Sequence, residues 1–202
     1  MNHEKKLSRS IRNNLGLMAG AALLLAATTG NAAIVCDTPP LGGALPYSIP
    51  DNIDGVYANL VTGAYNNGSV ANWDINFYNN SAGLSFWTNP GTGPGTNQVV
   101  SSTPGTADVL AAGATIGPGQ TYNTSNVTGG TVPDALLGGG SGYIGVRFYN
   151  EVTSAQNYGW VALTTTGPNG FPATITGFCY ENTGAAITAG TTPVTLQGFS
   201  VD

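Results

Sequence analysis

The sequence predicts an all-β protein, an antiparallel β-sandwich of the jelly-roll kind that forms a single domain. Apolar and polar residues alternate with a period of two in many short stretches, which is the pattern of strands with one buried face. Clusters of Gly, Pro, Asn and Ser separate these stretches, as expected of turns. Beyond residue 33, no stretch shows a sustained apolar period of 3.6. Seven or more short strands of this kind close most naturally as two packed sheets.

Residues 1–33 have the three parts of a secretory signal peptide. A basic start is followed by an apolar run at 15–27, and small residues lead up to Ala33. The run of about 13 residues is shorter than the roughly 20 that a membrane-spanning helix needs. We therefore expect cleavage near Ala33. Residues 34–202 are then expected to be a secreted domain, extracellular or periplasmic, without membrane insertion.

The predicted domain is strongly acidic. Four of the five Lys and Arg residues and the single His lie in residues 1–33, so Arg147 is the only basic residue that remains, against nine Asp and Glu. One cation cannot neutralise a row of phosphates, so nucleic acid and anionic lipid are not expected partners. Catalysis by Ser–His–Asp, by Cys–His or by a lysine is excluded, because the residue types are missing.

The amino-terminal half of the domain contains the first predicted strands. Residues 56–60 alternate, with Val56, Ala58 and Leu60 on one face. Residues 73–78 alternate in the same way, with an apolar face of Trp73, Ile75 and Phe77 and a polar face that carries Asp74 and Asn76. Leu84 and Phe86 continue the pattern.

Residues 88–142 are rich in Gly, Pro, Thr, Asn and Ser, which favours turns and loops. A linker between two domains is the alternative interpretation. The apolar pairs at 99–100 and 109–110, together with Ile116, indicate short strands and argue against a linker. Residues 107–114 are predicted to form one short helical turn.

The clearest strands follow as an antiparallel meander at 143–149, 158–164 and 173–180. In the first, Ile144, Val146 and Phe148 are predicted to face inward, and Gly and Pro at 166–170 supply a turn before the third. Residues 192–201 alternate again and predict a last edge strand, for which a frayed tail is the alternative.

The two cysteines of the domain, Cys36 and Cys179, are predicted to form a disulfide. An even number of cysteines in an exported chain favours pairing. Two buried free thiols are the alternative. A zinc site is excluded by the absence of a CxxC spacing and of histidine beyond residue 33.

The meander region also resembles PEP-CTERM-type and related exported bacterial proteins. The resemblance is carried by GYIGVRFYNE, YGWVALTT and ATITGFCYENTGAAITAG, at Tyr143, Gly145, Arg147, Phe148, Tyr158, Gly159, Trp160, Tyr180, Glu181, Gly184, Ile187 and Gly190. The upstream segments DGVYANLVTGA and WDINFY are similar as well. The resemblance implies an exported, β-rich protein of the cell envelope or extracellular matrix, without an assigned activity. Sorted members end in a Pro-Glu-Pro motif, an apolar helix and a basic tail, which the ending at 199–202 does not match.

A first candidate binding site surrounds Arg147. It shares a strand face with Tyr143 and Tyr149, and Tyr158 and Trp160 lie on the next predicted strand. One interpretation is a clamp for an acidic ligand. The other is a structural Arg that stacks on Tyr or on Trp160 and pairs with a carboxylate.

Two further patterns involve carboxylates. Glu151 and Glu181 could act as acid and base in glycoside hydrolysis, or could be solvated or structural groups. Asp51, Asn52 and Asp54 lie in one tight turn and offer the oxygen ligands that calcium prefers. Ordinary turn chemistry is the alternative for that segment, and no other cofactor is expected.

The function expected from these observations is that of an exported, non-enzymatic structural or interaction protein of the bacterial cell surface or extracellular matrix. Its expected partners are extracellular polysaccharide or other surface proteins. A carbohydrate-binding module is the alternative, with a stacking platform drawn from Tyr57, Tyr78, Trp87, Tyr143, Tyr149, Tyr158 and Trp160. A glycosidase-like enzyme that uses paired carboxylates is the third hypothesis.

Overall fold

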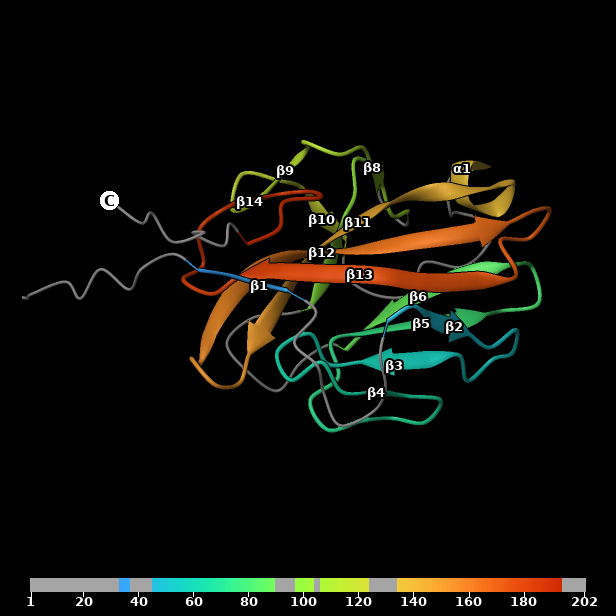
Figure 1. The fold of residues 1–202 in the computed structure, drawn as a ribbon, viewed down its shortest axis with the longest axis horizontal. Coiled ribbons are helices and arrows are strands. Elements are labelled where there is room, and N and C mark those ends of the chain that lie inside the picture. Colours follow the sequence, from blue (N-terminus) through green and yellow to red (C-terminus); the bar gives the residue numbers. More distant parts are fainter. Residues whose placement is uncertain (1–32, 37–44, 90–96, 104–105, 124–133, 194–202) are drawn as a thin grey trace, which may run out of the picture.

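The computed structural model describes residues 33–36, 45–89, 97–103, 106–123 and 134–193, which form antiparallel sheets packed on one another (Figure 1). The predicted all-β, antiparallel sandwich is confirmed. A large sheet and a four-stranded sheet lie face to face, and their strands run in roughly the same direction across Figure 1. Such aligned packing lets the inner side chains of both sheets share one core.

The large sheet is built around the predicted meander. Its centre consists of β11 (Gly139–Asn150), β12 (Ala155–Thr166) and β13 (Ala173–Glu181). The remaining strands are short and add to its edges, in the order β1-β13-β12-β11-β7-β10, with β2 also on β13 and β8 also on β11. Their bounds are β1 (Ile34–Cys36), β2 (Tyr47–Ile49), β7 (Gln98–Val100), β8 (Val109–Leu110) and β10 (Tyr122–Asn123).

The hairpin of β11 and β12 is longer than the sequence predicts. Pairing runs without a break from Gly139 opposite Thr166 to Asn150 opposite Ala155. The extra residues are polar, glycine or alanine, and their backbone groups complete the ladder although no apolar alternation marks them. Only residues 151–154 form the connecting turn, so half of the polar segment 150–157 between the two predicted strands belongs to the ladder.

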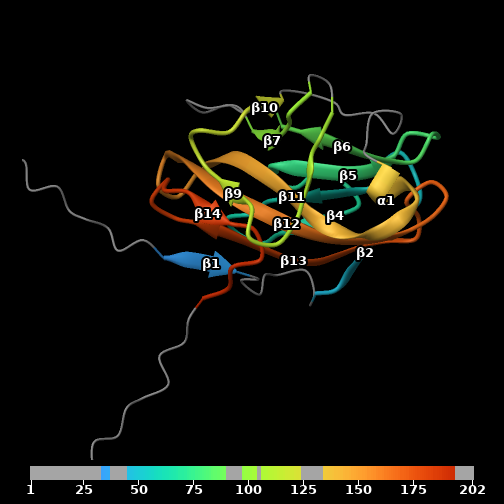
Figure 2. The ribbon, with the colours of Figure 1, turned by 90° about the horizontal axis from the view of Figure 1, so that it is seen from above.

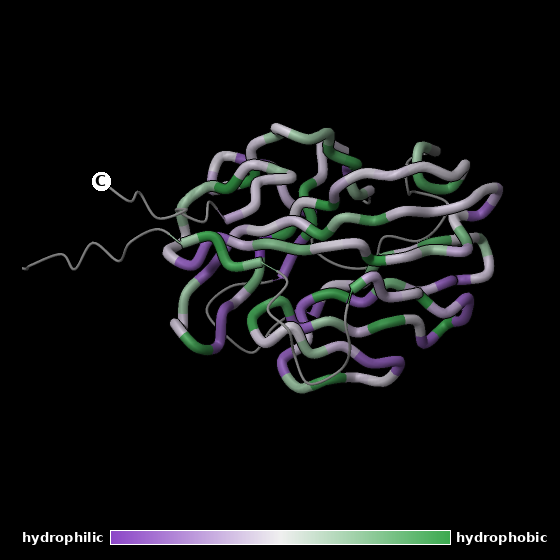
Figure 3. The backbone as a smooth tube through the Cα atoms, viewed as in Figure 1, coloured by the Kyte–Doolittle hydropathy of each residue, from purple (hydrophilic) through white to green (hydrophobic). Residues whose placement is uncertain are grey.

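The second sheet has the order β4-β3-β5-β6, with β3 (Val56–Ala58), β4 (Tyr65–Asn66), β5 (Ile75–Asn79) and β6 (Leu84–Thr88). Alternate residues of its strands face the large sheet. Figure 3 shows that hydrophobic and hydrophilic residues follow one another along these strands. The shared core contains Val56, Ala58, Ile75, Phe77, Leu84, Phe86, Ile144, Val146, Phe148, Val161 and Leu163. Each fully buried Phe or Leu contributes about 1.5–3 kcal/mol relative to an exposed one.

A small ribbon covers the other face of the large sheet. It pairs β9 (Thr115–Ile116) with β14 (Ile187–Thr188) and lies across β11 and β12 in Figure 2. Ile116 and Ile187 of this ribbon pack with Trp160 in a second apolar cluster. Gly145 permits the close approach, because a Cβ there would lie 2.6 Å from Val100 and 3.1 Å from Ile116. The central strands are therefore buried on both faces.

Helical structure is limited to the four residues of α1 (Asp134–Leu137) in the described part of the chain. The helical turn predicted at 107–114 is wrong, because Val109 and Leu110 form β8 and pair with β11 instead. The strands expected at 99–100, 109–110 and 116 are confirmed and join the sheets, which argues against a linker. No described helix is long and apolar enough to cross a bilayer. The strand predicted at 192–201 lies almost wholly outside the described residues.

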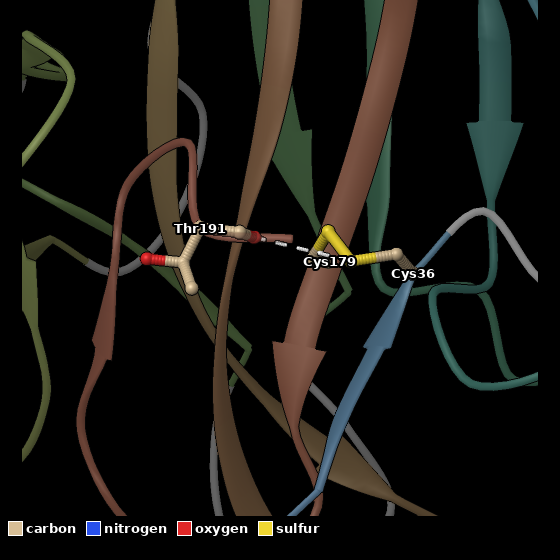
Figure 4. Close-up of a disulfide and its surroundings, with 3 residues drawn as sticks. All are labelled: Cys36, Cys179 and Thr191. Atoms are coloured by element: carbon tan, nitrogen blue, oxygen red, sulfur yellow. Dashed lines mark hydrogen bonds between the residues drawn. A yellow bond between two sulfur atoms is a disulfide. The ribbon is translucent and has the colours of Figure 1, made fainter. Parts of the chain in front are cut away.

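The predicted disulfide is present. Cys36 of β1 lies directly opposite Cys179 of β13, with the two Cα atoms 4.0 Å apart, and their sulfur atoms are bonded (Figure 4). The carbonyl oxygen of Thr191 lies 3.9 Å from the Sγ atom of Cys36. The bond therefore fastens the short first strand to the centre of the large sheet, next to the segment that follows β14.

We predict that replacing both cysteines, as Cys36→Ala with Cys179→Ala, lowers the free energy of unfolding by up to about 5 kcal/mol. The bond spans 143 residues, and its loss restores the entropy of that loop to the unfolded chain. Denaturant melts of both forms measure the change. Labelling of two thiols in denatured, unreduced wild-type protein would show instead that the bond does not form.

Candidate functional site

The residues predicted to bind a ligand around Arg147 lie on one face of the large sheet, but the covering strands bury much of that face. Tyr158 and Trp160 are only 6% and 5% exposed. Tyr143 is half-buried and meets Trp160 edge to face, with ring centroids 5.2 Å apart. Tyr149 is half-buried further along β11. Tyr143, Tyr158 and Trp160 therefore act mainly as packing in the second apolar cluster, to which Tyr149 does not belong.

Arg147 rests on an aromatic ring. Its guanidinium carbon lies 4.4 Å from the centroid of the Tyr122 ring, and Tyr158 lies opposite it in the ladder. Burial raises the pKa of Tyr122, Tyr158 raises it further, and the Arg147 charge opposes this, so Tyr122 stays neutral. The structural interpretation, an Arg stacked on Tyr or on Trp160, agrees with this geometry, and the ring is that of Tyr122.

The two glutamates proposed as a catalytic pair have different partners. Both oxygens of Glu181 accept hydrogen bonds from the turn that follows β13, from the N–H groups of Thr183 and Ala185 and from the Thr183 hydroxyl. Glu181 thus closes a turn. Glu151 lies at the tip of the β11–β12 hairpin and accepts a hydrogen bond from Asn59 instead.

The turn proposed to bind calcium is exposed and partly self-bonded. The Asn52 Oδ1 atom accepts the Gly55 N–H at 2.8 Å, and Asp51 accepts a hydrogen bond from the Asn79 amide. The Asp54 carbonyl oxygen accepts a hydrogen bond from Asn76. These contacts are those of a closed turn. Within the described ranges, no three His, Cys, Asp or Glu side chains gather as a metal site, and calcium binding by Asp51, Asn52 and Asp54 stays a prediction.

Three aromatic side chains gather on the outer side of the four-stranded sheet, and we call them the aromatic face: Tyr57, Trp73 and Trp87. The Trp73 ring meets Tyr57 and Trp87 edge to face, at centroid distances of 5.0 Å and 5.4 Å. Trp87 is 39% exposed, and the other two rings are half-buried. The rings are steeply inclined to each other, so they form a faceted surface rather than a flat platform.

The position of Trp73 corrects the sequence analysis, which placed it on the inward face with Ile75 and Phe77. The strand β5 begins only at Ile75, and Asn72 adopts a left-handed backbone with φ of 50°. The turn breaks the period of two just before the strand. Trp73 is therefore free to lie against Tyr57 and Trp87 on the outer side.

Next to the aromatic face is a small polar cavity, which we call the end cavity. Its volume is about 40 Å³, and its lining residues come from the tip of the β11–β12 hairpin and from loops next to the four-stranded sheet. Trp73 belongs to both features, since it lines the cavity and contacts Trp87. The complete lining is Asn72, Trp73, Asp74, Asn89, Asn97, Tyr149 and Glu151.

Asp74 is the most buried carboxyl group of the cavity, at 2% exposed. The Leu60 N–H donates to its Oδ2 atom at 2.7 Å, and the Asn97 amide donates to Oδ1 at 3.1 Å. Desolvation raises the pKa of Asp74 well above its usual value, and the charge of Glu151 raises it further, against the effect of the two hydrogen bonds. Asp74 is thus pushed toward the neutral, protonated form.

Glu151 presents the second carboxylate. Its Oε1 atom accepts the Asn59 amide at 2.7 Å, and Asn59 also binds the carbonyl oxygens of Ala71 and Asn72. The Oε2 atom is buried and receives no hydrogen bond from the residues that the structure describes. Leaving a buried acceptor without a donor costs about 1–3 kcal/mol, more when it is charged. The Oε2 atom is the one acceptor of this cavity with an evident need for a donor.

The sequence gives little sign of this cavity. Asp74 alternates with Trp73 and Ile75 and therefore looks like a solvent-facing strand residue, yet it is buried. The asparagines involved are common in the whole chain. Comparisons with family models, with curated proteins and with solved structures find no match to this chain. The site is therefore interpreted from its own geometry.

We predict that Arg147→Met lowers the free energy of unfolding by about 1–3 kcal/mol, because it removes the cation that rests on Tyr122. Tyr122→Leu removes the same contact from the other side. A double-mutant cycle on thermal or denaturant unfolding should give a coupling of about 0.5–2 kcal/mol. Additive losses in the cycle would contradict the stacked role.

We predict that Asp74 makes the protein less stable as pH rises above about 4. The folded state raises the pKa of Asp74, so it holds a proton that the unfolded chain releases near pH 3.9, and the free energy of unfolding falls through that window. Asp74→Asn should show a flatter pH profile than wild type, although it loses one accepted hydrogen bond at every pH.

Denaturant melts between pH 4 and 8 measure this difference. Glu151→Gln should flatten the profile in part, because the Glu151 charge contributes to the raised pKa of Asp74. Asp108→Asn, which changes a half-buried carboxylate bonded to Ser102, is the matched control. Parallel profiles for wild type and Asp74→Asn would contradict the assignment.

Proposed function

We propose that this protein is an exported, non-enzymatic interaction protein of the cell exterior that binds extracellular polysaccharide through the aromatic face. The observation that carries the proposal is the exposure of Trp87, whose ring meets Trp73 edge to face while Trp73 also contacts Tyr57. Large aromatic rings left at the surface in a group favour a binding role, because their burial in a complex recovers apolar area.

The composition of the face favours a neutral partner. Its three rings carry no charge, and Arg147 is engaged with Tyr122 on the large sheet. A sugar ring offers apolar C–H groups on its faces and hydroxyl groups around its edge. That combination suits aromatic rings beside polar groups such as those of the end cavity.

Binding rather than catalysis is proposed because the sequence candidates for chemistry have structural partners. Arg147 rests on Tyr122, and the carboxylate of Glu181 closes a turn. Among the described residues, the two carboxyl groups that line the end cavity together are those of Asp74 and Glu151. A protonated Asp74 is also the form that a proton-donating role requires, and the test below includes an assay for hydrolysis.

Export is supported by the predicted signal peptide and by the resemblance to PEP-CTERM-type proteins. The disulfide between Cys36 and Cys179 is of the kind that persists in oxidising compartments. The low number of positive charges in residues 34–202 agrees with a partner that is neither nucleic acid nor anionic lipid.

We predict that Trp87→Ala weakens polysaccharide binding at least tenfold while the melting temperature changes little. The purified exported protein is applied to a glycan array, and the strongest hits are measured by calorimetry. Tenfold corresponds to about 1.4 kcal/mol, a modest amount for one exposed indole that becomes buried. The surface location of Trp87 predicts a stability change within about 1 kcal/mol.

The matched control is Ile53→Ala, which removes another exposed apolar side chain, 67% exposed, from a turn outside the aromatic face. It should leave binding unchanged. Release of reducing sugar from the same glycans is assayed in parallel. Equal binding by wild type and Trp87→Ala would refute the proposed surface, and hydrolysis would refute the non-enzymatic role.

A further inference from the structure

We propose that the end cavity is a hydroxyl-binding subsite for a neutral sugar residue whose ring lies against Trp73 and Trp87. The inference rests on the proposed function and adds the polar part of the same binding site. It assigns a ligand-contacting role to Glu151, with Asp74 and Asn72 beside it.

The first argument is the shared position of Trp73. Its ring meets Trp87 at 5.4 Å, and the same residue lines the cavity with Glu151 and Asp74. The Trp73 side chain therefore connects a ligand on the aromatic face to the cavity that Glu151 and Asp74 line. Sites that bind small ligands typically combine apolar rings with a few convergent polar groups of this sort.

The second argument is size. About 40 Å³ exceeds the roughly 10–15 Å³ that one water needs, but it is far less than a sugar ring occupies. The cavity can admit a hydroxyl group and leaves the ring outside. A ring that stays outside the cavity meets Trp73, which is the arrangement that the aromatic face offers.

The third argument is hydrogen-bonding complementarity. Glu151 Oε2 is a buried acceptor without a donor in the described part of the chain. Asp74 lines the same cavity, and its environment favours the protonated form, which can donate. A hydroxyl group both donates and accepts, whereas an ammonium group only donates and a carboxylate only accepts. A neutral sugar hydroxyl therefore matches this pair of groups better than either ion.

The neighbouring hydrogen bonds keep the subsite in place before a ligand arrives. Asn59 fixes Glu151 Oε1, and Asn97 fixes Asp74 while its own Oδ1 accepts the Tyr149 N–H at 2.8 Å. These bonds join the hairpin tip to the loops of the four-stranded sheet. A preorganised acceptor loses little conformational entropy when a hydroxyl binds.

The test measures binding of cellohexaose, laminarihexaose, xylohexaose and mannohexaose to the exported protein by calorimetry. Glu151→Gln keeps the oxygen that accepts from Asn59 and replaces the free acceptor by a donor. It should weaken the best hexaose about tenfold or more, as loss of a charge-assisted hydrogen bond predicts. Asn72→Gly removes a side-chain amide from the lining of the end cavity, and glycine tolerates the left-handed backbone at this position. This variant should weaken binding by a smaller factor than Glu151→Gln.

Asp108→Asn is the matched control for the loss of one carboxylate and should bind as wild type does. Melting temperatures of all variants identify any that fail to fold. If Glu151→Gln does not fold, Asn72→Gly decides the outcome. Titrations with calcium chloride and with EDTA form a separate arm, because a cation is the competing partner for the free oxygen.

The outcomes separate the two proposals. No binding of any hexaose by wild type overturns the proposed function and, with it, the subsite. Binding that Trp87→Ala weakens, but that Glu151→Gln and Asn72→Gly leave unchanged, overturns the subsite alone. Loss of binding on EDTA treatment, restored by calcium, assigns Glu151 to a cation and also overturns the subsite. Selective weakening by Glu151→Gln without a calcium effect supports it.

Discussion

The continuous ladder between β11 and β12 is the interaction on which the other parts of the structure depend. Pairing over twelve residues in each strand makes one rigid hairpin, and both of its faces are covered. The four-stranded sheet packs on one face and the β9–β14 ribbon on the other (Figure 2). Burial on both faces explains why this hairpin can hold only one basic residue, and why that residue, Arg147, rests on Tyr122. It also explains Gly145, where a larger residue would collide with the covering layer.

The same hairpin builds the candidate site, because its length carries the tip past the core to the loops of the other sheet. There Glu151 meets Asn59, and Asn97 contacts both Asp74 and the backbone of Tyr149. A buried carboxyl group, Asp74, and the half-buried Glu151 thereby line one cavity. Desolvation, and then the charge of Glu151, raises the pKa of Asp74, and hydrogen bonds from the Leu60 N–H and the Asn97 amide oppose this rise. Beyond residue 33 the chain has one Arg and no Lys or His, and that Arg rests on Tyr122. No basic side chain therefore pairs with these carboxyl groups among the described residues.

The sequence predicted what depends on local periodicity. The alternation of Ile144, Val146 and Phe148 fixes which face of β11 is buried, and Cys36 and Cys179 fix one long-range contact. What it could not predict depends on which strand lies beside which. Tyr158 and Trp160 look like a surface platform until the β9–β14 ribbon, drawn from two distant segments, is placed over them. Asp74 looks solvent-facing for the same reason, since Leu60 and Asn97 reach it only in the folded chain. The break at Asn72, which turns Trp73 outward, depends on one backbone angle that alternation does not reveal.

The charge distribution links the fold to the kind of ligand that it suits. An acidic surface repels anions, and the one cation is stacked on a ring, so an anionic ligand would meet no free positive group in the described part of the chain. A cationic ligand would find carboxylates, yet the one nearest the core tends to be protonated and has a reduced charge to offer. A neutral ligand with hydroxyl groups avoids both difficulties. Its apolar face matches Tyr57, Trp73 and Trp87, and its hydroxyl groups match an acceptor that is already held in position by Asn59.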